Sequence, residues 1–359
     1  MRTMRLEFRL AVFFGLLCYS QSFLFPITRK DVAVQQRIFA QKATTENEVA
    51  LRTYSYKFKD YNVTYRYKPP APGHERDAPL LLIHPVGIGL SSWFWENFMD
   101  AWEYGGPVYA PDLWGCGKVE DDDHLRQMPS SSFPDRWVDA CENMLSLSVD
   151  SSTPKKSLFP FVGKSWSSSS TTSRWVIVAQ GGLAPIGVRV VHRNLSQISH
   201  LILTSPPTWS DMTTTVPRKD LQRNDQFLRS PVWGSLAFRL LETRWAVSFF
   251  SNLFLFASNN VNDTTRWLDC VQAGVGPAQR YAVMAFNAGF CQQTSNEKEL
   301  TELPQPTLIL QGDEDKSRNR DEYVQKMKDC RIQTITGKNV LPWESPDTVC
   351  RAIREFLVK

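Results

Sequence analysis

A short apolar segment that ends in two glycines constrains the fold of this chain more than any other stretch. Residues 174–180 read RWVIVAQ, which is apolar and rich in β-branched residues, as in a buried strand. Gly181 and Gly182 follow directly, and residues 183–194, LAPIGVRVVHRN, carry apolar side chains at helical spacing. The segment is therefore predicted to be a strand that turns sharply into a helix at Gly181.

The same alternation of strands and helices extends to both sides of this segment. Further strands are expected at residues 79–85, 107–113, 200–207, 306–312 and 331–337, and a β-hairpin at residues 52–68. Helices are expected at residues 91–103, 134–149, 183–194, 321–330 and 345–358. Strands that alternate with helices form parallel sheets with right-handed crossovers. The sequence thus predicts an α/β fold with a mostly parallel eight-stranded sheet flanked by helices.

One long segment departs from this alternation. Between about Trp209 and Thr301 helical patterns rich in Trp and Phe dominate, and the sheet pattern then resumes. The aromatic residues of this segment include Trp233, Phe238, Trp245, Phe249, Phe250, Phe254, Trp267 and Phe286. The prediction is a helical cap at residues 208–301, inserted after strand six of a core made of residues 51–207 and 302–359.

Four loops at the ends of predicted strands carry a family resemblance. They are HPVGIG at residues 84–89, DLWGCG at residues 112–117, QGDED at residues 311–315 and GKNVLPWESP at residues 337–346. With the sharp turn at Gly181, they resemble the α/β-hydrolase superfamily, in its capped branch of haloalkane dehalogenases and epoxide hydrolases. The resemblance covers residues 52–358 and implies the α/β-hydrolase fold. The chain also looks close to uncharacterised hydrolase-like proteins of cyanobacteria and plastids that share a Gln-Gly turn.

This resemblance implies a degenerate catalytic triad. In the superfamily, the turn after strand five carries a nucleophile, and an acid and a histidine base follow it in the chain. The nucleophile position falls on Gly181, which has no side chain, and the base position on Asn339, whose amide has no useful basicity. The acid position is best matched by Asp315, with Asp313 as the alternative.

The histidine content supports this conclusion without an alignment. The five histidines are His74, His84, His124, His192 and His200, and none follows position 200. No shift of the alignment can therefore place a histidine after the acid. Given the fold, a triad in its usual order is excluded.

Two side chains near these positions keep several interpretations open. Cys116 is the best spare nucleophile, whereas a cysteine that fills space in a loop is the simpler interpretation. Asp315 is a relict orienting acid, a solvated loop acid or a polar handle for a ligand. A hydrogen bond between Asp315 and Asn339 is also chemically reasonable.

The oxyanion hole of the superfamily uses backbone N–H groups, which do not depend on side chains. The candidate loop residues are His84, Val86, Gly87 and Gly182, with N–H donors at Gly182 and at Val86 or its neighbour. His84 is expected to have a packing role. A helix begins directly after the turn and adds its positive end. Gly181 relieves the backbone strain of the turn and leaves the space of a nucleophile empty.

Two functions follow from this pattern. The first is a non-catalytic binder of an apolar molecule with a carbonyl or carboxylate group, or a scaffold. The second is an atypical hydrolase or lyase for a small apolar substrate, which uses Cys116, a water held by Asp315 or a reactive group of the substrate. Scattered cysteines without a C-x-x-C pair and the lack of a basic run predict no cofactor, no metal and no nucleic-acid partner. The pattern leaves the oligomeric state open.

The first 50 residues predict targeting rather than a folded domain. A basic start and an apolar run at residues 10–18 are typical of a signal peptide, here residues 1–22. The run is short for a bilayer, so no stable membrane span is expected after its removal. Residues 23–50 begin with Phe23 and resemble the plastid transit segment of diatoms and related algae. The expected location is the plastid, with the secretory pathway or an uncleaved membrane anchor as alternatives.

Overall fold

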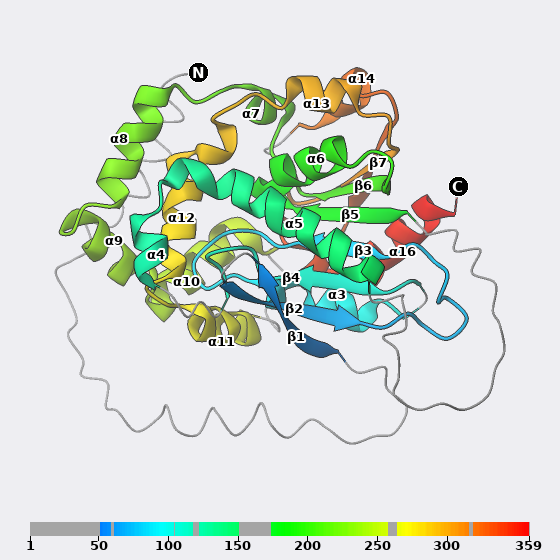
Figure 1. Cartoon of the computed structure of the whole chain (residues 1–359), viewed down its shortest axis with the longest axis horizontal. Coiled ribbons are helices and arrows are strands. Elements are labelled where there is room, and N and C mark those ends of the chain that lie inside the picture. The colour runs from blue at the N-terminus through cyan, green and yellow to red at the C-terminus, as the bar shows by residue number, and fades with distance from the viewer. Residues whose placement is uncertain are drawn as a thin grey trace. The chain divides into compact units, whose positions relative to one another are not determined.

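An eight-stranded sheet forms the centre of the unit made by residues 49–359 (Figure 1). Its strands are β1 (Arg52–Phe58), β2 (Tyr61–Lys68), β3 (Leu80–Ile83), β4 (Val108–Pro111), β5 (Trp175–Gln180), β6 (Ile198–Thr204), β7 (Thr307–Gly312) and β8 (Cys330–Ile335). Their order is β1-β2-β4-β3-β5-β6-β7-β8. β2 is antiparallel to β1 and to β4, and every other pair is parallel. The predicted mostly parallel eight-stranded sheet is therefore confirmed.

The computed structural model describes residues 51–58, 61–103, 105–117, 122–150, 174–257, 264–315 and 319–358. The predicted signal and transit segments lie outside the described residues. None of the described helices combines the length and the apolar character needed to cross a bilayer.

Alternate residues of the central strands pack into two separate apolar layers. In β5, Ile177 and Ala179 belong to one layer, and Val176 and Val178 belong to the other. The helices of the core are η2 (Ser92–Trp95), α3 (Glu96–Ala101), α4 (Asp122–Gln127), η3 (Ser130–Ser132), α5 (Phe133–Asp150), η4 (Gly181–Leu183), α6 (Ala184–Arg193), α14 (Asp321–Lys326), α15 (Leu341–Glu344) and α16 (Pro346–Leu357). Because helices cover both faces, the middle strands are apolar throughout rather than alternating.

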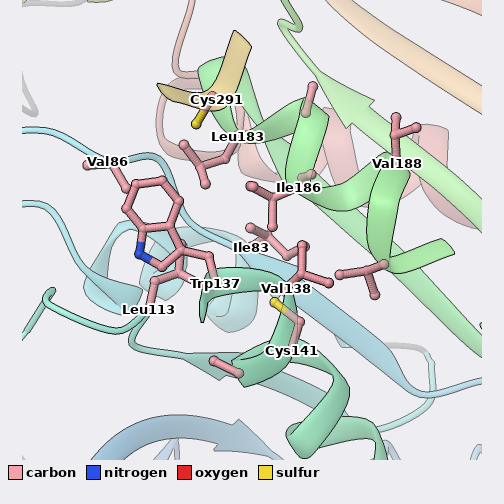
Figure 2. Close-up of a cluster of buried hydrophobic side chains, with 14 of the residues drawn as sticks. Ile83, Val86, Leu113, Trp137, Val138, Cys141, Leu183, Ile186, Val188 and Cys291 are labelled. Atoms are coloured by element: carbon pink, nitrogen blue, oxygen red, sulfur yellow. The ribbon is translucent and has the colours of Figure 1, made fainter. Parts of the chain in front are cut away.

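The first layer lies between the sheet and helices α5 and α6. Figure 2 shows Trp137 and Val138 of α5 beside Ile83 of β3 and Ile186 of α6. The second layer holds α3, α15 and α16 against the opposite face of the sheet. The turn between β5 and α6, which we call the elbow, is thus held by buried side chains of both the strand and the helix.

Along the chain, a series of helices follows β6 and precedes β7, which confirms the predicted cap after strand six (Figure 1). These are α7 (Trp209–Thr213), α8 (Arg218–Leu228), α9 (Trp233–Leu241), α10 (Arg244–Phe250), the π-helical turn η5 (Ser251–Leu255), α11 (Thr264–Gly274), α12 (Gln279–Ala288), η6 (Phe290–Gln292) and α13 (Glu297–Glu302).

Several element boundaries differ from the expectations, for local reasons. The strand expected at 200–207 ends at Thr204, before Pro206 and Pro207, which lack the N–H that a ladder needs. The helix expected at 91–103 begins as a 3-10 turn and ends at Ala101. The helix expected at 321–330 ends at Lys326, where the next residue adopts an extended conformation.

Candidate functional site

The turn between β5 and α6 has a left-handed backbone at its first residue, Gly181. Gly181 has a φ of +57°, a left-handed value that strains any residue with a Cβ. An ideal Cβ built on Gly181 would have no heavy atom within 4 Å apart from its chain neighbours, although the residue itself is buried. The turn therefore combines a left-handed backbone with open space where a Cβ of residue 181 would project.

The neighbouring Gly182 has different surroundings, because a cap side chain lies against it. A Cβ on Gly182 would lie 2.4 Å from Cζ of Phe286, so this ring of α12 covers the backbone of Gly182. The N–H of Gly182 lies in the first turn of η4, where no intrahelical partner exists. The site thus combines a backbone donor with an apolar wall.

His84 begins the loop after β3 and uses both ring nitrogens to hold that loop. Nε2 accepts a hydrogen bond from the Leu113 N–H at 2.9 Å, and Nδ1 donates to the Pro85 carbonyl at 2.8 Å. Full burial lowers the pKa of His84, which keeps the ring neutral. The imidazole therefore ties the loop after β3 to the loop after β4 and has no nitrogen left for proton transfer.

The rest of this loop is clamped by the cap. The Gly89 N–H donates to Oε1 of the buried Gln279 at 2.8 Å, and Nε2 of Gln279 donates to the Leu90 carbonyl at 2.8 Å. A Cβ on Gly89 would lie 2.1 Å from the carbonyl oxygen of Val271, so only glycine permits this approach to α11. Helices α11 and α12 therefore close over the loop that contains Val86 and Gly87.

The two acid candidates occupy different positions in the loop after β7. Asp315 is buried and pairs with the buried Arg320, whose Nη2 lies 2.7 Å from Oδ2 of the carboxylate. Arg320 also donates through Nε to the Pro206 carbonyl at 2.8 Å. Asp313 is exposed and accepts a hydrogen bond from the Gly337 N–H at 3.0 Å. The negative charge at the best acid position is therefore compensated by an arginine.

The segment at the base position is held by its backbone. The Asn339 carbonyl accepts a hydrogen bond from Nε2 of Gln180 at 2.7 Å, and the Asn339 N–H donates to the Leu255 carbonyl at 3.0 Å. Oε1 of Gln180 accepts a hydrogen bond from the Thr204 hydroxyl at 2.5 Å. Gln180 directly precedes Gly181 and is buried, so it links the elbow to the base loop and to β6. This role of Gln180 was not predicted from the sequence, although a glutamine at the end of an apolar strand was a usable signal.

Ser205 is a second residue of this region that was not predicted from the sequence. Among the described residues it is the one non-glycine with a positive φ, +46°, and its hydroxyl is buried without a hydrogen-bond partner there. Its N–H donates to the Leu310 carbonyl at 2.8 Å, which fixes it at the end of β6. Strained residues with unsatisfied polar groups concentrate at functional sites. Nothing in the segment LTSPP distinguishes this serine in sequence.

Cys116, the spare nucleophile candidate, lies within the first apolar layer. Burial, with a further contribution from the charge of Asp112, raises the pKa of the Cys116 thiol. A raised pKa disfavours the thiolate, which is the nucleophilic form. Across the described segments, no three His, Cys, Asp or Glu side chains are arranged to hold a metal ion.

Three tryptophans fill the junction between the cap and the core. The ring centroids of Trp93, Trp267 and Trp343 lie 5.1 to 5.4 Å apart in mutual edge-to-face contacts. Nε1 of Trp93 donates to the Gly89 carbonyl at 2.8 Å, and Nε1 of Trp267 donates to the Ser251 hydroxyl at 3.0 Å. Aromatic pairs of this geometry each contribute about 0.5–1.5 kcal/mol beyond their area.

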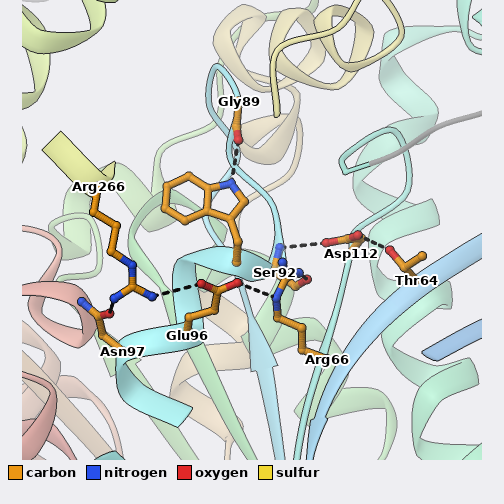
Figure 3. Close-up of polar contacts among 9 residues, drawn as sticks. Thr64, Arg66, Gly89, Ser92, Glu96, Asn97, Asp112 and Arg266 are labelled. Atoms are coloured by element: carbon orange, nitrogen blue, oxygen red, sulfur yellow. Dashed lines mark hydrogen bonds and ion pairs between the residues drawn. The ribbon is translucent and has the colours of Figure 1, made fainter. Parts of the chain in front are cut away.

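Polar contacts next to these rings join the same parts of the chain (Figure 3). Arg266 of α11 donates to Oδ1 of Asn97 at 2.6 Å and lies 3.2 Å from Oε2 of Glu96. Glu96 also accepts from Nε of Arg66 at 3.0 Å, which extends the network to β2. The tryptophans and this network together fix the cap on the core.

Comparisons with known proteins agree with this architecture. The sequence model described as "Alpha/beta hydrolase family" matches residues 80–352. A serine hydrolase from Cycloclasticus zankles has a TM-score of 0.60 at 15% identity, over 86% of this chain and 98% of that one. An epoxide hydrolase (TM-score 0.57, 14% identity) and a mutant haloalkane dehalogenase from Agrobacterium tumefaciens (TM-score 0.56, 17% identity) each cover 86% of this chain, and 99% and 97% of their own. No curated protein matches the sequence.

Proposed function

We propose that this chain, which belongs to the alpha/beta hydrolase family, binds a small apolar molecule at the elbow without hydrolysing it. The ligand would carry a carbonyl or carboxylate oxygen. The observation that carries the proposal is the open, buried space at Gly181, in a turn whose φ of +57° matches that of a nucleophile elbow. A buried space beside backbone donors suits a ligand with one polar end.

The environment of the other triad positions supports binding rather than hydrolysis. Asn339 supplies no base, and its segment is held in place by Gln180. The carboxylate of Asp315 pairs with Arg320 and is thereby drawn away from the role of an orienting acid. Acyl transfer needs a nucleophile and a base within hydrogen-bond reach of each other, and these positions provide neither.

The chemistry of the walls suggests the class of ligand. The N–H of Gly182 lies at the start of η4, where a helix terminus favours a negatively polarised oxygen. The ring of Phe286 lies on the same residue and offers an apolar contact. A carbonyl or carboxylate with an apolar tail complements both surfaces.

The proposal is tested with purified protein and two glycine variants. Native mass spectrometry of protein from its own organism is expected to show a copurifying apolar molecule. Gly181→Met is expected to abolish its retention, because the side chain fills the open space. Gly73→Met is the matched control, since Gly73 also has a positive φ (+86°) and open surroundings but lies in a surface turn. Equal retention by Gly181→Met and the wild type would contradict binding at the elbow.

A hydrolytic function gives a different result in the same preparation. The wild type is expected to show no turnover of p-nitrophenyl esters and no covalent labelling by fluorophosphonate probes. Labelling that maps to one serine would replace binding with catalysis as the function. Turnover that is lost in Cys116→Ala would assign an atypical enzyme.

The cellular location belongs to the same proposal. The resemblance of residues 1–45 to a two-part plastid address supports a plastid location. A fluorescent fusion of the full chain is expected inside the plastid, and a signal confined to the secretory route would overturn this part.

A further inference from the structure

Two consecutive cap helices carry apolar side chains on their solvent side. On α9 these are Trp233, Leu236 and Leu240, and on α10 and η5 they are Trp245, Phe249 and Leu253. We call these six residues the cap apolar face. Their exposed fractions lie between 38% and 60%. The spacings of three and four residues place each set along one side of its helix.

The cap apolar face is distinct from the side of these helices that packs on the protein. Phe238 of α9 and Val247 of α10 are buried in the apolar layers, and Ala246 of α10 is also buried. Helices α9 and α10 are therefore apolar on two sides, which is unusual for a helix next to water. Trp233 and Trp245, which belong to the predicted helical cap, lie on the outer side.

We infer that the cap apolar face docks on an anionic lipid surface. Helices that lie in the interface of a bilayer expose Trp, Phe and Leu on one side and keep their backbone groups satisfied internally. Trp in particular concentrates at the boundary between lipid and water. The ring of Trp245 stacks on that of Phe249, with centroids 5.7 Å apart, which holds both rings in the exposed position.

The charges at the edge of this face favour an anionic surface. Within residues 233–255 the ionisable side chains are Arg239, Glu242 and Arg244. The charge of Glu242 is compensated by Arg280, whose Nε lies 2.6 Å from Oε1 of the glutamate. Arg244 pairs in the same way with Asp269, with 2.6 Å between Nη1 and Oδ1.

Among the described residues, Arg239 and Lys338 are two further cations at this edge. Arg239 is exposed and has no carboxylate within ion-pair distance among the described residues. Nζ of Lys338 donates to the Leu253 carbonyl at 2.7 Å, which places this ammonium beside the apolar face.

The same charges argue against a second copy of the chain as the occupant. A two-fold dimer would place the same patch on both sides of the interface. Such an interface would gather the Arg239 and Lys338 cations of both copies at one apolar contact, which is unfavourable without added carboxylates. Anionic headgroups complement both cations, and their attraction weakens as salt increases.

Vesicle flotation with the full chain tests the inference. The wild type is expected to float with vesicles of phosphatidylcholine and phosphatidylglycerol, and less with phosphatidylcholine alone. Trp233→Gln/Trp245→Gln is expected to reduce the bound fraction about tenfold or more, because two interfacial anchors are lost. Leu195→Gln/Val324→Gln is the matched control, since these exposed apolar residues lie outside the cap. Near-ultraviolet circular dichroism confirms that each variant is folded.

Three outcomes would overturn the inference. Flotation of the Trp233→Gln/Trp245→Gln variant at the wild-type level would show that another part of the chain contacts the lipid. Absence of wild-type flotation would remove the lipid contact altogether. A concentration-dependent dimer in sedimentation analysis that disappears in the same variant would assign the face to self-association. Ligand retention at Gly181 is measured separately, so failure of this inference leaves the proposed function untouched.

Discussion

Alanine is expected to have opposite steric effects at two adjacent positions, because the space at Gly181 is open and that at Gly182 is filled by Phe286. In Gly181→Ala the methyl group enters free space, so the penalty is limited to the left-handed backbone. That strain is about 1–2 kcal/mol for a residue with a Cβ. Alanine also lowers the conformational entropy of the unfolded chain, which stabilises the folded protein by about 0.4–1 kcal/mol. The expected loss in the free energy of unfolding is therefore about 1 kcal/mol.

Gly182→Ala meets a different obstacle. Its methyl group would lie 2.4 Å from Cζ of Phe286, which forces the ring to move. Overpacking of this kind is expected to destabilise by about 1–3 kcal/mol. Phe286→Leu removes the obstructing ring, so Gly182→Ala is expected to be less destabilising in that background than in the wild type.

Urea denaturation of the four variants measures these free energies of unfolding. A loss above about 3 kcal/mol for Gly181→Ala would mean that other atoms occupy the space at the elbow. An unchanged effect of Gly182→Ala in the Phe286→Leu background would show that the ring does not cover the turn. Either result would refute the geometry on which the proposed ligand site rests.

Three further predictions concern groups around the elbow. Asp315→Asn is expected to destabilise the protein by about 3–5 kcal/mol in urea denaturation, because it removes the carboxylate that pairs with the buried Arg320; a loss below about 1 kcal/mol would contradict a structural ion pair. The folded-state pKa of His84 is lowered, so the unfolded state binds the extra proton first and stability falls as the pH drops below about 6.5, by at most about 1.4 kcal/mol per pH unit. His84→Gln should reduce this slope, and an identical slope would assign it to other groups. Ser205→Gly is expected to raise the free energy of unfolding by about 1–3 kcal/mol, because it removes a strained φ and a buried hydroxyl without a partner; a destabilised variant in thermal unfolding would show that the hydroxyl is satisfied in the folded protein.

The fold was predictable because its signals are local. The run from Trp175 to Gln180 is apolar without alternation, which is typical of a strand covered on both faces. The glycine pair directly after this run predicted the turn. The loops at the ends of the other strands were likewise recognisable from short local motifs. Residue chemistry also predicted that Gly181 and Asn339 supply neither a nucleophile nor a base.

The contacts of the site were not predictable, because they depend on residues far apart in the chain. Gln180 binds the Asn339 carbonyl across 159 residues, and Phe286 reaches Gly182 from the cap. Arg320 lies only five residues after Asp315, yet nothing in the sequence indicates that both are buried. The helical pattern of α9 and α10 likewise indicates two apolar sides without showing which one packs inward.

The ion pair between Asp315 and Arg320 implies that substitutions at positions 181 and 339 alone do not build a working triad. Gly181→Ser/Asn339→His supplies a hydroxyl and an imidazole, but the carboxylate of Asp315 remains paired with Arg320 at 2.7 Å. Without an orienting acid, the imidazole is held neither in the required tautomer nor in the required orientation, which lowers turnover by about 10⁴ in a working triad.

Adding Arg320→Met removes the ion pair with Asp315 and puts an apolar side chain of similar length in place of the guanidinium. The triple variant is therefore expected to give the first measurable labelling by a fluorophosphonate probe, whereas the double variant stays at the wild-type level. Arg320→Met alone controls for any general loosening of the fold and should not be labelled. Equal labelling of the double and triple variants would show that Asp315 is not the acid of this fold, and would move that position to Asp313.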